Sequence, residues 1–103
     1  MKVVWTIEAL RKLDEIERFI AQDSPQRASA FIDQLLAEGD SIASFPEMGR
    51  VVPELSRPEI REILVGKYRM VYKRTPEQIF ILTVFEGHRL LLSKELDPSK
   101  GDS

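Results

Sequence analysis

Two amphipathic helix patterns, followed by three closely spaced strand patterns, are the feature that most limits the folds open to this chain of 103 residues. The first helix is predicted over about residues 7–22, after a short apolar strand at residues 3–5, with Thr6 as its N-cap. Its apolar residues recur at three- and four-residue spacing, which predicts one buried stripe. The stripe contains Leu10, Leu13, Ile16, Phe19 and Ile20.

A second helix is predicted immediately afterwards. Ser24 is suited to cap it, and Pro25 to occupy its first position, because the missing proline N–H costs nothing there. The apolar positions again follow a helical period. They are Ala28, Phe31, Ile32, Leu35, Leu36, Ile42 and Ala43. Since the connection is short, the two helices should form an antiparallel hairpin, and their apolar stripes require a third surface.

That third surface is predicted to be a β-sheet. Residues 60–65, 68–74 and 78–86 are rich in β-branched and aromatic residues, and the short connections between them predict an antiparallel meander. Three prolines in the preceding loop argue against ladder structure before about Glu59. The predicted fold class is therefore α+β, with the order N-terminal strand, antiparallel helical hairpin and three-stranded antiparallel meander (βααβββ). One domain is expected over residues 1–96, with a flexible C-terminal tail at residues 97–103.

The first turn of the meander determines which side chains share a face of the sheet. Gly66 and Lys67 suit a two-residue type II′ turn, from which the register of the two flanking strands follows. The helix-covered face should then contain Arg61, Ile63, Val65, Tyr68, Met70 and Tyr72. Arg69 and Lys73 project from the opposite face, which no predicted helix covers, with Glu62 diagonal to Arg69. This cationic pair is a candidate site; the alternative is an exposed Arg69–Glu62 ion pair of little energetic weight.

Composition excludes several classes of protein. The chain has no cysteine, and therefore no disulfide, thiolate nucleophile or cysteine-ligated metal. No apolar run approaches the ~20 residues that span a bilayer, so a cytoplasmic location without membrane contact is expected. The sequence contains no glycine-rich phosphate loop, nucleophile elbow or metal-ligand spacing, so neither a cofactor nor a metal is expected.

Charge is distributed unevenly along the chain. The net charge is −2, but residues 1–44 contain five basic and eight acidic residues, whereas residues 50–89 contain eight basic and five acidic residues. This asymmetry suggests that the second half faces an anionic partner. The plainer interpretation is that these charges only solvate the surface of a small domain.

Several short motifs, in this order and spacing, resemble the ParE-like branch of the ParE/RelE toxin superfamily. They are Val3-Val4-Trp5-Thr6, Phe45-Pro46-x-x-Gly49-Arg50, Pro53-Glu54-Leu55, Ile60-Arg61-Glu62, Gly66-x-Tyr68-Arg69-x-x-Tyr72 and Gly87-His88-Arg89. The resemblance covers about residues 2–92. It implies the toxin of a bacterial type II toxin–antitoxin system, also called a plasmid-stabilisation protein, which a cognate antitoxin binds and neutralises.

The resemblance leaves two modes of growth inhibition open. ParE-like toxins poison DNA gyrase, which is the function we expect, whereas RelE-like toxins are ribosome-dependent mRNA interferases. Cleavage at a 2′-OH needs a proton acceptor, a proton donor and cations for the developing charge. The stretch after Arg89 contains no tyrosine, where a RelE-like chain is expected to place one. A third hypothesis is a non-toxic binding module of the same fold.

The resemblance and the strand register together imply roles for particular residues. Arg69, Lys73 and Arg89 are expected to bind the target, and if the chain is a ribonuclease its catalytic residues would be Arg69, Arg89 and His88. A lone histidine is more often a surface or packing residue than a catalyst. Antitoxin binding is expected from apolar residues of the open face and of the stretch after the last strand. These are Leu64, Val71, Leu90, Leu91 and Leu92. Tyr68 and Tyr72 are expected in the core.

Overall fold

Both helices begin at the caps that the sequence contains. In the computed structural model, which describes residues 1–87, α1 (Ile7–Ala21) follows Thr6, whose side chain accepts a hydrogen bond from the Ala9 N–H. Helix α2 (Pro25–Ser41) follows Ser24, which caps the Arg27 N–H in the same way. The prediction that α2 continues to Ala43 is wrong, because the chain tightens there into a 3-10 turn, η1 (Ile42–Ser44). Neither described helix is long and apolar enough to cross a membrane.

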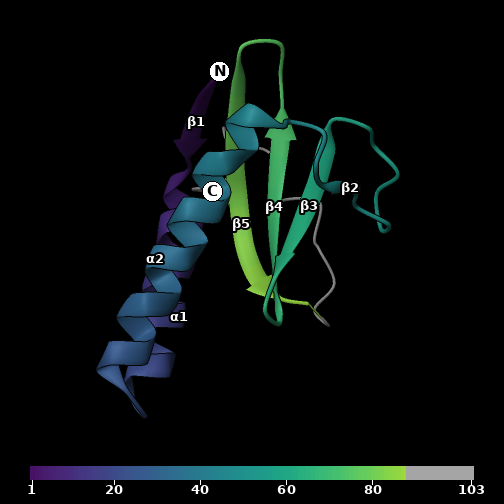
Figure 1. Cartoon of the computed structure of the whole chain (residues 1–103). Helices are drawn as coiled ribbons and strands as arrows, with labels where there is room; N and C mark the ends of the chain where they lie inside the picture. The colour runs from purple at the N-terminus through teal and green to yellow at the C-terminus, as the bar shows by residue number, and fades with distance from the viewer. Residues whose placement is uncertain (88–103) are drawn as a thin grey trace.

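Five strands form one sheet in the order β1-β5-β4-β3-β2 (Figure 1). Strands β3 (Ile60–Val65), β4 (Tyr68–Arg74) and β5 (Gln78–Glu86) have the predicted bounds and form the predicted antiparallel meander. Strand β1 (Lys2–Trp5) pairs with β5 in the parallel direction. The helical hairpin follows β1 and packs on one face of the sheet, which confirms the α+β fold class.

The short strand β2 (Arg50–Val51) was not predicted. It pairs antiparallel with β3, so that Arg50 lies opposite Glu62 and Val51 opposite Arg61. The expectation that no ladder forms before Glu59 is therefore wrong. The prolines at positions 46 and 53 flank this strand without interrupting it, and they limit its length instead.

The turn between β3 and β4 has the predicted geometry. Gly66 has a φ of +59°. Ser56 is the only other described residue with a positive φ, so the φ of Lys67 is negative. A positive φ at the first central residue alone is the pattern of a type II′ turn. The register that follows is confirmed: Val65 pairs with Tyr68, and Ile63 pairs with Met70.

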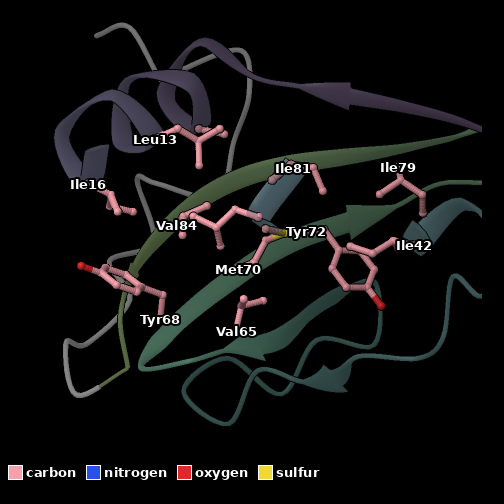
Figure 2. Close-up of a cluster of buried hydrophobic side chains, with 12 residues drawn as sticks. Leu13, Ile16, Ile42, Val65, Tyr68, Met70, Tyr72, Ile79, Ile81 and Val84 are labelled. Atoms are coloured by element: carbon pink, nitrogen blue, oxygen red, sulfur yellow. The ribbon is translucent and has the colours of Figure 1, made fainter. Parts of the chain in front are cut away.

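The main core lies between the hairpin and the sheet (Figure 2). As predicted, Tyr68 and Tyr72 belong to it. Leu10 and Phe19 do not: they are 49% and 59% exposed. The buried stripe of α1 is centred on Leu13 and Ile16, and at 3.6 residues per turn Leu10 and Phe19 lie about 90° to either side of it. The buried core members are Ala9, Leu13, Ile16, Leu35, Ile42, Val65, Tyr68, Met70, Tyr72, Ile79, Ile81 and Val84.

A second, smaller core covers the opposite face of the sheet. Residues 50–58, which we call the covering segment, pack Val52 and Leu55 onto this face. A register shift between β4 and β5 lets Ile81 and Val84 both join the main core, while Leu82 joins the second one. The prediction of an uncovered face is therefore wrong. The second core contains Val52, Ile60, Val71, Leu82 and Phe85, with Leu55 and Phe80 at its edge.

Candidate functional site

Arg69, the first candidate from the sequence, lies in a buried ion-pair network. Its side chain is only 6% exposed. The two terminal nitrogens, Nη1 and Nη2, each donate to a carboxylate oxygen of Glu54 at 2.7 Å, and Nε donates to Glu62 Oε1 at 2.7 Å. Glu62 is fully buried and also accepts from Arg50 Nε at 2.6 Å. These four side chains, Arg50, Glu62, Arg69 and Glu54, alternate in charge, and their own formal charges sum to zero.

The sheet and the covering segment build this network together. Glu62 pairs with Val71 on β4, which places it diagonal to Arg69, as predicted. Arg50 reaches Glu62 because β2 pairs with β3 in a register that places these two residues directly opposite each other. Glu54 enters from the covering segment, 15 residues before Arg69 in the chain. The Arg69 guanidinium also lies 5.1 Å from the centre of the Phe85 ring, a cation–π distance.

The network holds Arg69 in its charged form. Hydrogen bonds to the Glu54 carboxylate, supported by those to Glu62, raise the pKa of Arg69 above its ordinary value, against the opposing effect of burial. Two carboxylates therefore balance the guanidinium inside the fold. The prediction that Arg69 projects from an open face is wrong, because it treated residues 50–58 as a loop remote from the sheet.

The other candidates on this face differ in exposure. Lys73 is half-buried near the opposite end of β4 and pairs in register with Ile60. Leu64 is 59% exposed, so its expected role in antitoxin binding stays a prediction. Val71 is fully buried in the second core, and its side chain is not part of the surface. The expectation that Val71 contacts an antitoxin from an open face therefore loses its structural basis.

Several sequence expectations lie outside the described residues. They concern His88, Arg89, Leu90, Leu91 and Leu92, together with the domain end at residue 96 and the tail at residues 97–103. Their expected roles stay predictions.

Most cations of the basic half are paired within the fold. Arg57 contacts Glu59, while Arg61 and Arg74 both lie near Glu47 at 3.9 and 3.6 Å. Within residues 50–87 the two lysines, at positions 67 and 73, form no such ion pair. The described part of the chain also contains no cluster of acidic or histidine side chains suited to a metal. The basic composition of this half therefore does not produce a long phosphate-binding track.

Sequence reasoning missed the partners that neutralise Arg69. Arg50 and Glu54 were quoted only within the family motifs, and no role was expected of either. One signal was present: Val52 and Leu55 are apolar residues on either side of Glu54 in a loop otherwise rich in proline and polar residues. Apolar residues at such spacing indicate that a loop packs against a surface, and Glu54 is then brought to that surface with them.

Tyr72 connects the sheet to the loop before β2. Its ring is fully buried, its hydroxyl donates to the Pro46 carbonyl at 2.8 Å, and the Gly49 N–H donates to the same hydroxyl at 3.0 Å. Arg61 Nη1 donates to the Gly49 carbonyl at 2.9 Å. These contacts fix where the covering segment begins.

The Tyr72 hydroxyl gives a prediction for stability as a function of pH. At pH 7, Tyr72→Phe should lower the free energy of unfolding by about 1–3 kcal/mol, because it leaves the Gly49 N–H without its buried partner. Burial raises the pKa of Tyr72 above its ordinary 10.0. The wild type, with its folded-state pKa raised, should therefore lose stability as the pH rises above 10, a loss that the phenylalanine variant lacks. Urea titrations from pH 7 to 11 should show the two stabilities converging; a constant difference would contradict the assignment.

The sequence of this chain matches a known protein family. The model of the family described as ParE toxin of type II toxin-antitoxin system, parDE, matches residues 3–91. A protein of Sinorhizobium fredii named "Putative toxin Y4kP" is 31% identical over 88 residues, which cover 85% of this chain and 90% of that protein. "Toxin RelE2" of Caulobacter vibrioides is 39% identical over 64 residues, covering 62% of this chain and 68% of that protein.

A solved structure has the same fold. A chain of the chromosomal ParDE TA system from P. aeruginosa superimposes with a TM-score of 0.70, covering 84% of this chain and 95% of that chain. At 18% identity this likeness concerns the fold alone. The family assignment depends on the sequence match, which extends over most of the described chain and includes all four residues of the ion-pair network. This chain therefore belongs to the ParE toxin family of type II toxin–antitoxin systems.

Proposed function

We propose that this protein is a growth-inhibiting toxin that acts by binding DNA gyrase, without a catalytic step of its own, and that a cognate antitoxin neutralises it. The family match supports the toxin class. The observation that supports binding over catalysis is the closed sheet face. Arg69, which would stabilise charge in a ribonuclease, is instead paired with Glu54 and Glu62 beneath the covering segment.

Ribonuclease chemistry would need this face to be open. A developing phosphorane must approach cations closely, and the cations must not already be neutralised. Here two carboxylates occupy the guanidinium of Arg69, and a phosphate would have to displace the Glu54 carboxylate before reaching it. Displacing a bidentate carboxylate from a buried arginine is costly. This arrangement favours a role for Arg69 in stability.

A ribosome-dependent mRNA interferase is the second candidate. The observation in its favour is the 39% identity to the protein named Toxin RelE2. Its proposed catalytic residues would be Arg69, Arg89 and His88. A non-toxic binding module of the same fold is the third candidate.

Two assays on the purified full-length chain separate these candidates. In the first, DNA gyrase, ATP and relaxed plasmid are incubated with the protein; in the second, translating ribosomes and mRNA replace them. We expect inhibited supercoiling and intact mRNA. Intact supercoiling with cleaved mRNA would contradict the proposal and support the interferase, whereas no effect in either assay would support the binding module.

A charge-reversal variant of Lys73, compared with a matched control variant, tests whether the sheet takes part in target binding. Lys73 has no ion pair within the described residues and remains, with Arg89, a proposed target-binding cation. Lys73→Glu should raise the half-inhibitory concentration for gyrase about fivefold or more, because a like charge then faces the anionic partner. Arg18→Glu makes the same change on α1 and serves as the matched control, with little effect expected. Equal inhibition by both variants would remove Lys73 from the target-binding surface.

A further inference from the structure

The loop between η1 and β2 exposes two large apolar side chains to solvent. Phe45 is 69% exposed and Met48 is 49% exposed. The backbone between them forms a tight turn, because the Met48 N–H donates to the Phe45 carbonyl at 2.9 Å. This turn is tied to the sheet, since the hydroxyl of Tyr72 on β4 donates to the Pro46 carbonyl. We call residues 45–48 the Phe45 turn.

The Phe45 turn has the properties of a protein-binding surface. Single exposed apolar residues are common on any protein, but these two lie on a backbone that the fully buried Tyr72 ring holds in place. Such a turn loses little conformational freedom when a partner binds, so less of the binding energy is spent on ordering it. Aromatic residues, methionine and arginine are also the residues enriched in the buried centre of protein interfaces.

A pocket of about 530 Å³ adjoins the Phe45 turn at the end of the sheet where β4 is connected to β5 (Figure 1). Pro46 and Glu47 of the turn line one side of it, and Arg74, the last residue of β4, lines another. The remaining lining comes from the residues before β3 and from the β4–β5 turn, and it includes Pro58, Glu59 and Pro76. We call this depression the Arg74 pocket.

Arg74 is incompletely paired. Its side chain donates no hydrogen bond within the described residues, and its Nε is buried. Its one ion pair among these residues is a 3.6 Å contact to Glu47, whose side chain is 70% exposed. The backbone N–H of Arg74 donates to the Glu59 carbonyl at 2.9 Å, which fixes the position of the strand end. Buried polar groups are normally hydrogen-bonded, so this guanidinium is suited to an acceptor that a partner brings.

The charges around the Arg74 pocket favour one added negative group. Glu47 lies 3.6 Å from Arg74 and 3.9 Å from Arg61, so two guanidinium groups share one carboxylate and one positive charge remains. Glu59, the other acidic residue of the lining, is paired with Arg57 at 2.7 Å. A planar carboxylate can accept two N–H groups of a guanidinium side by side. The pocket is therefore complementary to a single carboxylate.

A protein suits this surface better than a nucleic acid does. A nucleic-acid strand brings a row of phosphates, which the exposed Glu47 carboxylate beside the pocket would repel. Phosphates also gain nothing from the apolar side chains of Phe45 and Met48. A protein surface that places one acidic side chain beside apolar residues matches both the pocket and the turn.

We propose that the Phe45 turn and the Arg74 pocket together contact the target protein, with apolar side chains of the target against Phe45 and Met48 and one of its carboxylates on Arg74. This inference rests on the proposed function, in which the target is DNA gyrase. It extends the contact expected of Lys73, which lies at the same end of β4 but on the opposite face of the sheet.

Inhibition of purified gyrase by full-length variants tests this surface. The half-inhibitory concentration for supercoiling and the dissociation constant for gyrase would be measured for Phe45→Ser and Arg74→Gln. Each variant should raise both quantities about tenfold or more relative to the wild type. The matched controls are Phe19→Ser and Arg18→Gln, which alter an exposed phenylalanine and an exposed arginine of α1. Each control should change either quantity by less than about threefold.

Urea unfolding separates a lost contact from a lost structure. Phe45 is exposed and the Arg74 side chain donates no hydrogen bond within the described residues, so Phe45→Ser and Arg74→Gln should unfold at nearly the same urea concentration as their controls. Arg74→Lys, which keeps the charge but not the planar fork, should recover part of the inhibition that Arg74→Gln loses. A large loss of stability in Arg74→Gln would overturn the inference, because Arg74 would then be needed within the fold.

The outcomes distinguish the surface from the proposed function. If the wild type inhibits gyrase and Phe45→Ser and Arg74→Gln inhibit it equally well, the surface assignment is overturned and the proposed function stands. If the wild type does not bind gyrase, but these two variants alone relieve growth arrest in cells, gyrase is overturned as the target and the surface is supported. Binding of single-stranded RNA that Arg74→Gln weakens would assign the pocket to phosphate instead. A wild-type dimer in light scattering that Phe45→Ser dissociates would assign the turn to a second copy.

Discussion

Replacing Arg69 with alanine should lower the free energy of unfolding by about 3–5 kcal/mol. The change leaves the fully buried Glu62 carboxylate with Arg50 as its one remaining cationic partner among residues 1–87, and it removes the ion pair that joins Glu54 of the covering segment to β4. Removing one partner from a buried ion pair is costly because the remaining charge stays desolvated. Urea unfolding at neutral pH, followed by circular dichroism, measures this loss.

The matched control is an exposed arginine. Arg18 contacts Asp14 at 3.1 Å on the surface of α1, and Arg18→Ala should change the stability by less than about 1 kcal/mol. If Arg69→Ala costs no more than this control, the ion-pair network does not stabilise the fold. Such a result would support the alternative left open by the sequence, in which the Arg69–Glu62 ion pair has little energetic weight. The folded fraction of an Arg69 variant should therefore be measured beside its toxicity, because an unfolded toxin is also inactive.

Gly49→Ala should also be strongly destabilising, by about 3 kcal/mol. A Cβ at this position would lie 2.6 Å from the Glu62 backbone oxygen and 2.8 Å from both Cε1 and the hydroxyl oxygen of Tyr72. Two of these neighbours cannot move easily, because one belongs to the backbone of β3 and the other to a fully buried ring. The same displacement would break the hydrogen bonds that join residues 46–49 to Tyr72.

Gly66→Ala provides the comparison, because it tests backbone strain without a clash. A Cβ on Gly66 would meet nothing closer than 3.7 Å, but its φ of +59° costs an alanine about 1–2 kcal/mol. Thermal and urea unfolding of both variants should therefore rank Gly49→Ala as the less stable. The reverse order would mean that residues 46–49 can move away from Tyr72 without disturbing the sheet.

The elements of the fold were predictable because their signals are local. The caps at Thr6 and Ser24 and the turn at Gly66 act over a few residues, and the predicted bounds of β3, β4 and β5 agree with the structure. The register of β3 and β4 followed from the turn alone. Burial was less predictable: Phe19 is apolar and at helical spacing, yet only the path of the sheet beneath α1 determines that it lies beyond the core.

By itself, the sequence determined the α+β class, the order of the two helices and of strands β1, β3, β4 and β5, the register between β3 and β4, and the family motifs. Only the tertiary structure decided what Arg69 does. Its partner Glu54 lies 15 residues away, and Arg50 lies 12 residues from Glu62, on a segment that no periodicity places. A periodic pattern specifies which residues of one element share a face, because side-chain direction is a property of the local backbone. Whether a distant segment covers that face, and so buries and neutralises its charges, depends on the packing of the whole chain.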